Sequence, residues 1–193
     1  MDDAAEELRT RLAERYAEPH RYYHDVRHLQ EVLRTVDALA DEADDVEAVR
    51  WAAWFHDAVY DVRRDDNEER SAQLAERELT ALGHDPGRVT EVARLVRLTA
   101  THNAQPGDAN GAVLCDADLW ILATDAARHA EYVADVRREY AHVPDDQFRA
   151  GRAAVLRALL GLDRLYRTEA AHARWEQPAR ANLSAELDRL AAP

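Results

Sequence analysis

The sequence predicts an all-α protein, a single-domain bundle of about eight or nine helices. Apolar residues recur at three- and four-residue spacing along most of the chain, and no segment alternates apolar and polar residues convincingly over five positions. Glycine and proline, at 6 residues each, are scarce and cluster at the expected breaks. A chain of 193 residues can bury a core as one unit, so the predicted domain covers residues 1–193.

In the first half of the chain, caps and breakers delimit five helices. Pro19 follows the first helix and Gly83 follows the fourth, because neither residue continues a helix well. Asp44 or Asp45 can cap the third helix, and Pro86 suits the first turn of the fifth. The predicted helices cover about 3–18, 25–39, 45–60, 67–82 and 86–102, with the second beginning near 23–25 and a polar loop at 61–66.

The second half of the chain begins with turn-forming residues over 103–111, which predict an exposed loop. Asp125 can cap one of the helices that follow, and Pro144 can begin another. The predicted helices cover about 112–123, 126–140 and 144–160, with a short final helix at 184–190.

The formal charge of −13, from 38 acidic and 25 basic residues, argues against partners that are nucleic-acid polymers or anionic membranes. A single cysteine, Cys115, excludes an intramolecular disulfide and a cysteine-rich zinc cluster. The acidic first residues lack the pattern of a signal peptide, and no apolar run approaches the roughly 18 residues of a membrane span. We therefore expect a cytoplasmic protein.

The dipeptide His56-Asp57 lies within the otherwise apolar run 51–60, where a buried imidazole and carboxylate need compensation. A divalent cation supplies that compensation in many proteins. The alternative is that the two side chains bond to each other or cap a helix. Further ligands elsewhere in the chain favour the metal.

His24 and His28 are four residues apart, so they lie on one face of a predicted helix. His28 leads into the apolar stripe of that helix and is expected to point inward as a metal ligand. His24 lies nearer the helix start and is expected to meet the substrate. The alternative is a pair of surface or capping histidines.

Asp116 and Asp118 are two carboxylates within an apolar helix, and acidic side chains are rarely buried unless they are paired or bind a metal. The two positions are about 200° apart around a helix, so they cannot both face the same way. One of them is expected to bind a metal while the other satisfies a neighbouring Arg, His or helix end. The alternative is that both bond to arginines.

The order of a lone His, a His-Asp pair and a distal Asp resembles the HD phosphohydrolase superfamily of helical metal enzymes. Other segments are similar to the predicted metal-dependent HD hydrolases of that superfamily, namely 19–24, 55–61, 66–72, 99–102, 116–119, 138–140, 151–152 and 179–182. The resemblance covers nearly the whole chain. It implies a helical bundle of the HD type.

The resemblance implies that His28, His56 and Asp57 are metal ligands, and the local sequence Ala-Asp-Leu favours Asp118 over Asp116 as the distal ligand. Asn67 stands where two-metal relatives usually have a histidine, which implies one metal per chain. Imidazoles with carboxylates suit Mn, Co, Ni, Fe or Zn, and Mg less well.

Acid–base chemistry needs a titratable group within reach of the attacking water or the leaving oxygen. Glu68 and Asp61 are the acidic candidates, with Glu68 preferred, although a carboxylate in the first turn also suits the helix dipole. His24 can protonate the leaving group, because its ordinary pKa lies near neutrality.

Phosphate binding needs cations in addition to the metal. The segments that resemble the family include Arg21 and Arg152, and the resemblance implies that these two arginines bind the phosphate of the substrate. His102 is expected to be a substrate contact or an extra ligand, with helix capping as the alternative. The predicted function is hydrolysis of a small phosphate ester, with nucleotides among the candidates, by a metal-activated water. A non-catalytic nucleotide sensor and a di-iron oxygenase of the same fold are the alternatives.

Overall fold

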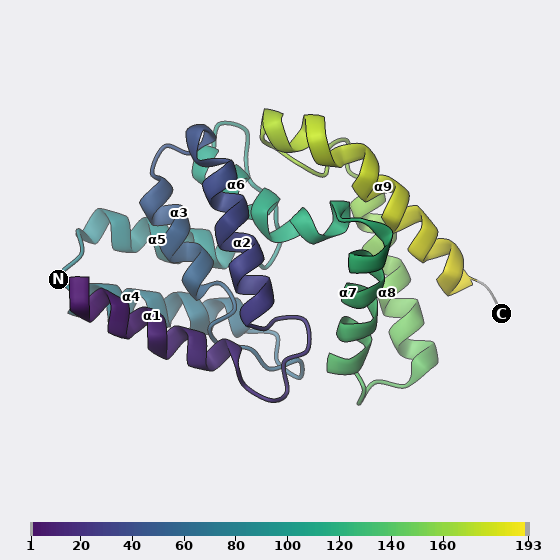
Figure 1. Ribbon diagram of the computed structural model, residues 1–193, viewed down its shortest axis with the longest axis horizontal. Coiled ribbons are helices and arrows are strands. Elements are labelled where there is room, and N and C mark those ends of the chain that lie inside the picture. Colours follow the sequence, from purple (N-terminus) through teal and green to yellow (C-terminus); the bar gives the residue numbers. More distant parts are fainter. Residues whose placement is uncertain (1, 192–193) are drawn as a thin grey trace.

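The computed structural model describes residues 2–191, and this part of the chain is helical without a strand, as the sequence predicts (Figure 1). Nine α-helices and two 3₁₀-helices occur within 2–191: α1 (Asp2–Tyr16), α2 (Val26–Ala38), η1 (Ala40–Glu42), α3 (Val46–Phe55), α4 (Asn67–Ala81), α5 (Pro86–Leu98), α6 (Ala109–Asp118), η2 (Leu119–Ala123), α7 (Ala126–Glu139), α8 (Asp145–Leu160) and α9 (Glu169–Ala191). The all-α class is confirmed.

Aspartate side chains cap many of these helices. The carboxylates of Asp25, Asp45, Asp85, Asp108 and Asp125 each accept a backbone N–H from the first turn of the helix that follows. These caps satisfy amides that have no partner inside the helix. Part of the acidic composition is therefore used to start helices.

The helices form two groups that meet at η2 (Figure 1). In the first group, α3 packs against α2, α4, α5 and α6. In the second, α7 and α9 pack against η2, and α8 packs against α9. A cluster of buried apolar residues runs through both groups, from Leu8 in α1 to Leu183 in α9. The single-domain organisation stays a prediction.

Helix α3 ends at Phe55, so the prediction that it continues to Tyr60 was wrong. Beyond Phe55, side chains from other helices replace the helical carbonyls as hydrogen-bond acceptors of the backbone N–H groups. The Asp57 N–H donates to the Tyr16 hydroxyl, and the Val59 N–H donates to the Ser71 hydroxyl. The dipeptide His56-Asp57 therefore lies just after the end of the helix, where it can turn toward neighbouring elements.

Three further helix boundaries differ from the prediction. Helix α5 ends at Leu98 and not near His102, whose φ of 50° is left-handed and does not fit a helix. Helix α6 begins at Ala109 and not near Ala112, because Asp108 accepts the Gly111 N–H as a cap. It also ends at Asp118, where a 3₁₀ turn follows.

Helix α9 is much longer than the predicted final helix at 184–190. Pro178 lies inside it and argues locally against a continuous helix. Tertiary contacts support its start, because the Glu42 carboxylate accepts the N–H groups of Glu169 and Ala170. The Thr168 hydroxyl accepts the Ala171 N–H in the same turn. Thr168 is a local N-cap, whereas the distant Glu42 cannot be inferred from the local sequence.

Between residues 2 and 191, no helix is both long enough and apolar enough to span a bilayer. The cytoplasmic location stays a prediction.

Candidate metal centre

Three predicted ligands meet in the interior of the first helical group. The Nε2 atoms of His28 and His56 lie 3.0 Å apart, and Asp118 Oδ1 lies 3.2 Å from His28 Nε2. The imidazoles are only 2% and 1% exposed. One ligand atom from each residue lies within 4.8 Å of the others, an arrangement that could hold a metal ion.

Each of the three residues comes from the end of a different helix. His28 lies in the first turn of α2, where the Asp25 cap accepts its N–H. His56 directly follows α3, and Asp118 is the last residue of α6. Since α2, α3 and α6 pack against one another, their ends are brought together by the core.

Asp57 lies beside this group. Its Oδ2 is 3.1 Å from His56 Nε2 and 3.5 Å from His28 Nε2. The structure thus brings together His28, His56, Asp57 and Asp118, all of which the sequence predicted as ligands.

Asp116 faces away from the group and meets the start of α9. Its carboxylate accepts the N–H groups of Arg167 and Thr168 and the Thr168 hydroxyl at 2.8–3.0 Å. Burial raises the pKa of Asp116 to about 6 in spite of these bonds. Asp116 is therefore not placed as a metal ligand. It matches the expectation that one of the two aspartates satisfies a helix end.

The donor set fits a divalent cation. Ligands about 2.1 Å from a six-coordinate ion and at right angles to each other lie roughly 3.0 Å apart. The nitrogen–nitrogen and nitrogen–oxygen distances among these four side chains run from 3.0 to 3.7 Å. Two imidazoles and two carboxylates in this arrangement suit Mn, Fe, Co, Ni or Zn.

The electrostatics also call for positive charge at this point. Burial alone lowers the pKa of His28, but the neighbouring carboxylates of Asp118 and Asp57 raise it to about 10. Burial likewise opposes ionisation of Asp57 and Asp118, yet the surrounding histidines hold the pKa of both well below its ordinary value. The carboxylates thus stabilise a cation between them, and a metal ion would replace the proton of the imidazole.

Neighbouring groups orient the candidate ligands. His56 Nδ1 lies 2.8 Å from the Ala53 carbonyl oxygen, to which it donates, so Nε2 is left as the lone-pair nitrogen that faces Asp57 and Asp118. His102 Nε2 lies 2.7 Å from Asp118 Oδ2, the carboxylate oxygen that His28 does not contact. Such outer partners fix the tautomer and direction of metal ligands.

A polar cavity of about 380 Å³ opens over the centre, with Asp57 and Asp118 on its wall. His24, Glu68 and His102 line the same cavity. Within residues 2–191 the Glu68 carboxylate makes no hydrogen bond or ion pair, so it is available to a bound molecule. These placements put His24 and Glu68, two of the three predicted catalytic groups, beside the predicted ligands.

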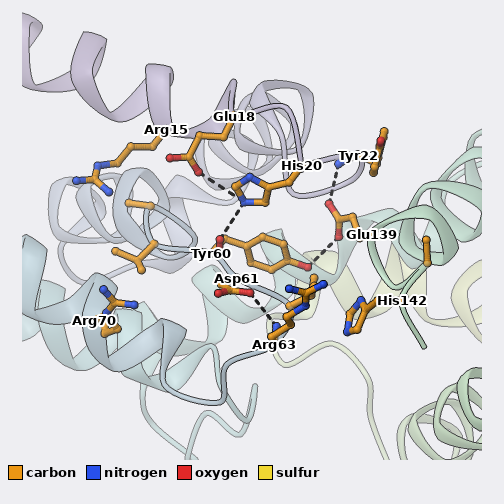
Figure 2. Close-up of a pocket in the computed structure, with 14 residues that line it drawn as sticks. Arg15, Glu18, His20, Tyr22, Tyr60, Asp61, Arg63, Arg70, Glu139 and His142 are labelled. Carbon is orange, nitrogen blue, oxygen red and sulfur yellow. Dashed lines mark hydrogen bonds and ion pairs between the residues drawn. The ribbon is translucent and has the colours of Figure 1, made fainter. Parts of the chain in front are cut away.

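Asp61, the other acidic candidate, does not line this cavity. Its carboxylate accepts the Arg63 N–H, and it lies on the wall of a separate cavity with Arg15, Arg70 and His142 (Figure 2). The reason is the loop that follows Tyr60, which turns the Asp61 side chain outward. The geometry therefore favours Glu68 over Asp61.

Asn67 holds that loop in place. Its amide oxygen accepts the Asp61 N–H at 3.1 Å and its amide nitrogen donates to the Asp61 carbonyl at 2.9 Å. The Asn67 side chain is thus engaged with the backbone, and the number of metal ions stays a prediction.

Arg21 and Arg152, the predicted phosphate clamps, are both occupied by protein groups. The buried Arg21 guanidinium donates to the carbonyl oxygens of His24, Asp57 and Ala58. Arg152 donates to both Glu186 oxygens at 2.7 and 3.1 Å. Arg21 ties the segment around His24 to the turn at Asp57, so its geometry supports a structural role.

Glu139, at the end of α7, was given no role in the sequence analysis. Its Oε1 accepts the Tyr22 N–H and its Oε2 accepts the Tyr60 hydroxyl (Figure 2). Oε1 also accepts the N–H groups of Tyr23 and His24. Glu139 Oε2 also lies 2.7 Å from His24 Nδ1. The only local signal was its place in the segment 138–140, which resembles the HD hydrolases.

Comparisons with protein-family models, with curated proteins and with solved structures find no match to this chain. The structure shows an all-helical protein with a His28, His56 and Asp118 group that could hold a metal ion. The HD resemblance rests on the motifs alone and stays a prediction.

Replacing Asp118 and Asp116 one at a time separates their roles. Asp118→Ala is expected to weaken Zn²⁺ or Mn²⁺ binding at least ~100-fold, because a ligand is lost. Asp116→Ala is expected to cost about 2–4 kcal/mol of unfolding free energy, because buried N–H groups lose their acceptor. Calorimetric metal titration and urea denaturation measure the two effects. Equal metal affinity in Asp118→Ala and wild type would contradict the assignment.

Glu139 predicts a pH-dependent contribution to stability. Burial raises the pKa of Glu139, but the bonds to His24 and to the backbone amides outweigh burial and lower this pKa to about 2. Because the pKa is lower in the folded state than in the unfolded state, the ionised Glu139 carboxylate stabilises the folded protein above about pH 4.5. This stabilisation is lost as the pH falls toward 2.

Glu139→Gln is therefore expected to be less stable than wild type by about 2–3 kcal/mol at pH 7, with a gap that narrows below about pH 4.5. Urea denaturation between pH 7 and pH 3 measures the gap, and Glu7→Gln at an exposed site serves as the control. A gap that is constant with pH would show that the Glu139 charge does not matter.

Proposed function

We propose that this protein is a metal-dependent phosphohydrolase that cleaves a small phosphate ester. The proposal rests on the group of two buried imidazoles and the Asp118 carboxylate, with Asp57 beside it, under a polar cavity lined by His24, Glu68 and His102. A divalent cation bound there would supply Lewis acidity and an activated water, which is the usual chemistry of such sites. One metal per chain is part of the proposal.

The geometry of His24 supports a role as proton donor to the leaving oxygen. Glu139 engages Nδ1 and also accepts the His24 N–H, so the imidazole is fixed in direction. Its Nε2 makes no hydrogen bond to the part of the chain that is described. A histidine held by a carboxylate through one nitrogen and free at the other is suited to general acid–base chemistry.

Glu68 supports the proposal as the candidate base. It lies on the cavity wall at the start of α4 and is half-buried, and no arginine neutralises it. A carboxylate in this position can accept a proton from water that attacks a phosphorus atom held over Asp57 and Asp118. His102, which contacts Asp118 Oδ2, lines the same cavity.

Phosphate release from a panel of aryl phosphates and nucleotides, with added Mn²⁺, Co²⁺ or Ni²⁺, tests the proposal. We expect metal-dependent hydrolysis that EDTA abolishes and that Asp57→Ala lowers at least ~100-fold with the fold intact. Tight nucleotide binding without turnover would instead support a sensor. More than one equivalent of iron in the purified protein would instead support an oxygenase.

Glu68 and Asp61 form a matched pair for testing the base. Glu68→Gln is expected to lower kcat about 100-fold while metal binding is kept, because the proton acceptor is lost. Asp61→Asn, a change of the same kind outside the cavity, is expected to alter kcat less than ~2-fold. Steady-state kinetics measure both, and the reverse ranking of the two variants would make Asp61 the better candidate.

A further inference from the structure

A second cavity adjoins the candidate metal centre on the side of α7 and α8. It has a volume of about 450 Å³. Its walls are mainly aromatic and aliphatic, with contributions from Tyr23, Tyr132, Val136, Phe148 and Val155. We call this cavity the apolar pocket. Its size and lining are those of a site for a small organic group.

The apolar pocket lies beside the polar cavity over the metal centre. His24 and Tyr140 line both cavities. A molecule that occupied both would run from Asp57 and Asp118 past His24 into the apolar pocket. In a bound phosphate ester of this reach, the bond between phosphorus and the leaving oxygen would lie near His24.

The charge distribution around the apolar pocket selects against a charged occupant. No carboxylate lines it, whereas each of the four other cavities described within residues 2–191 has aspartate or glutamate on its wall. This is notable in a chain with 38 acidic residues. The one arginine on the wall, Arg152, is neutralised by both Glu186 oxygens. The pocket thus offers no unpaired charge to a second phosphate or a carboxylate.

The side chains of the apolar pocket suit an aromatic ring. The rings of Tyr23 and Tyr132 meet edge to face with centroids 4.6 Å apart, and Phe148 adds a third ring to the wall. Edge and face contacts among aromatic rings add to the gain from burial. Val155 at the rim is 51% exposed, so a bound ring would cover apolar surface that now faces water.

We propose that the apolar pocket binds the leaving group of the substrate and that this group is an uncharged aromatic ring system. The proposal rests on the proposed function. Hydrolysis would break the bond between phosphorus and the ester oxygen and join the water oxygen to phosphorus. The ester oxygen would take up a proton, and the products are inorganic phosphate and the aromatic alcohol. The substrate class is therefore a phosphate monoester of an aromatic alcohol.

Two esters with leaving oxygens of similar basicity test the substrate class, namely 2-naphthylmethyl phosphate and ethyl phosphate. The metal-loaded protein is expected to favour the naphthylmethyl ester at least ~10-fold in kcat/KM, because only this ester fills the apolar pocket. Val155→Glu, which puts a charge at the rim, is expected to lower that preference about 10-fold. Leu162→Glu replaces another exposed apolar residue away from the pocket and is expected to keep the preference.

Binding of the product alcohol, 2-naphthylmethanol, tests the apolar pocket without turnover. Its fluorescence in the metal-free protein is expected to report binding that Val155→Glu weakens about 10-fold and Leu162→Glu leaves unchanged. Equal hydrolysis of both esters, or naphthylmethanol binding that Val155→Glu does not alter, would overturn the proposal while leaving the phosphohydrolase in place. Absence of hydrolysis with Val155-dependent naphthylmethanol binding would overturn the phosphohydrolase and support the pocket as an aromatic site.

Discussion

Two carboxylates buried against two imidazoles need a cation among them, and the other features of the centre follow from this constraint. Asp57 and Asp118 lie within 3.1–3.7 Å of the Nε2 atoms of the buried His28 and His56 imidazoles, at the floor of the polar cavity. Leaving such charges uncompensated would cost several kcal/mol. The four side chains meet because α2 begins here while α3 and α6 end here.

Other buried carboxylates hold the surrounding segments to this point. Glu139 accepts hydrogen bonds from three backbone N–H groups and from the Tyr60 hydroxyl. These bonds hold His24 between the polar cavity and the apolar pocket. Asp116 fastens the start of α9 to α6 from the face opposite Asp118. Acidic residues of this chain thus serve as helix caps, as acceptors that hold loops in place and as candidate metal ligands. The groups that surround each carboxylate determine which of these roles it has.

The sequence predicted those parts of the molecule that depend on local pattern. Helical periodicity gave the all-α class, and the 200° separation of Asp116 and Asp118 anticipated their different surroundings. The local sequence pattern could not predict the end of α3 at Phe55, because the hydroxyls of Tyr16 and Ser71 that replace the helical hydrogen bonds come from distant segments. For the same reason it missed most of α9 and the role of Glu139. Arg21 and Arg152 were expected to bind phosphate on the resemblance, and it could not show that the distant groups of Asp57, Ala58 and Glu186 occupy them.

Anomalous diffraction from crystals grown with Co²⁺ or Zn²⁺ tests the central claim most directly. We predict one strong peak in each chain, about 2.0–2.2 Å from the Nε2 atoms of His28 and His56 and from a carboxylate oxygen of Asp118. A map without a peak at this point, in which His28 and the carboxylates stay bonded to one another at saturating metal, would contradict it.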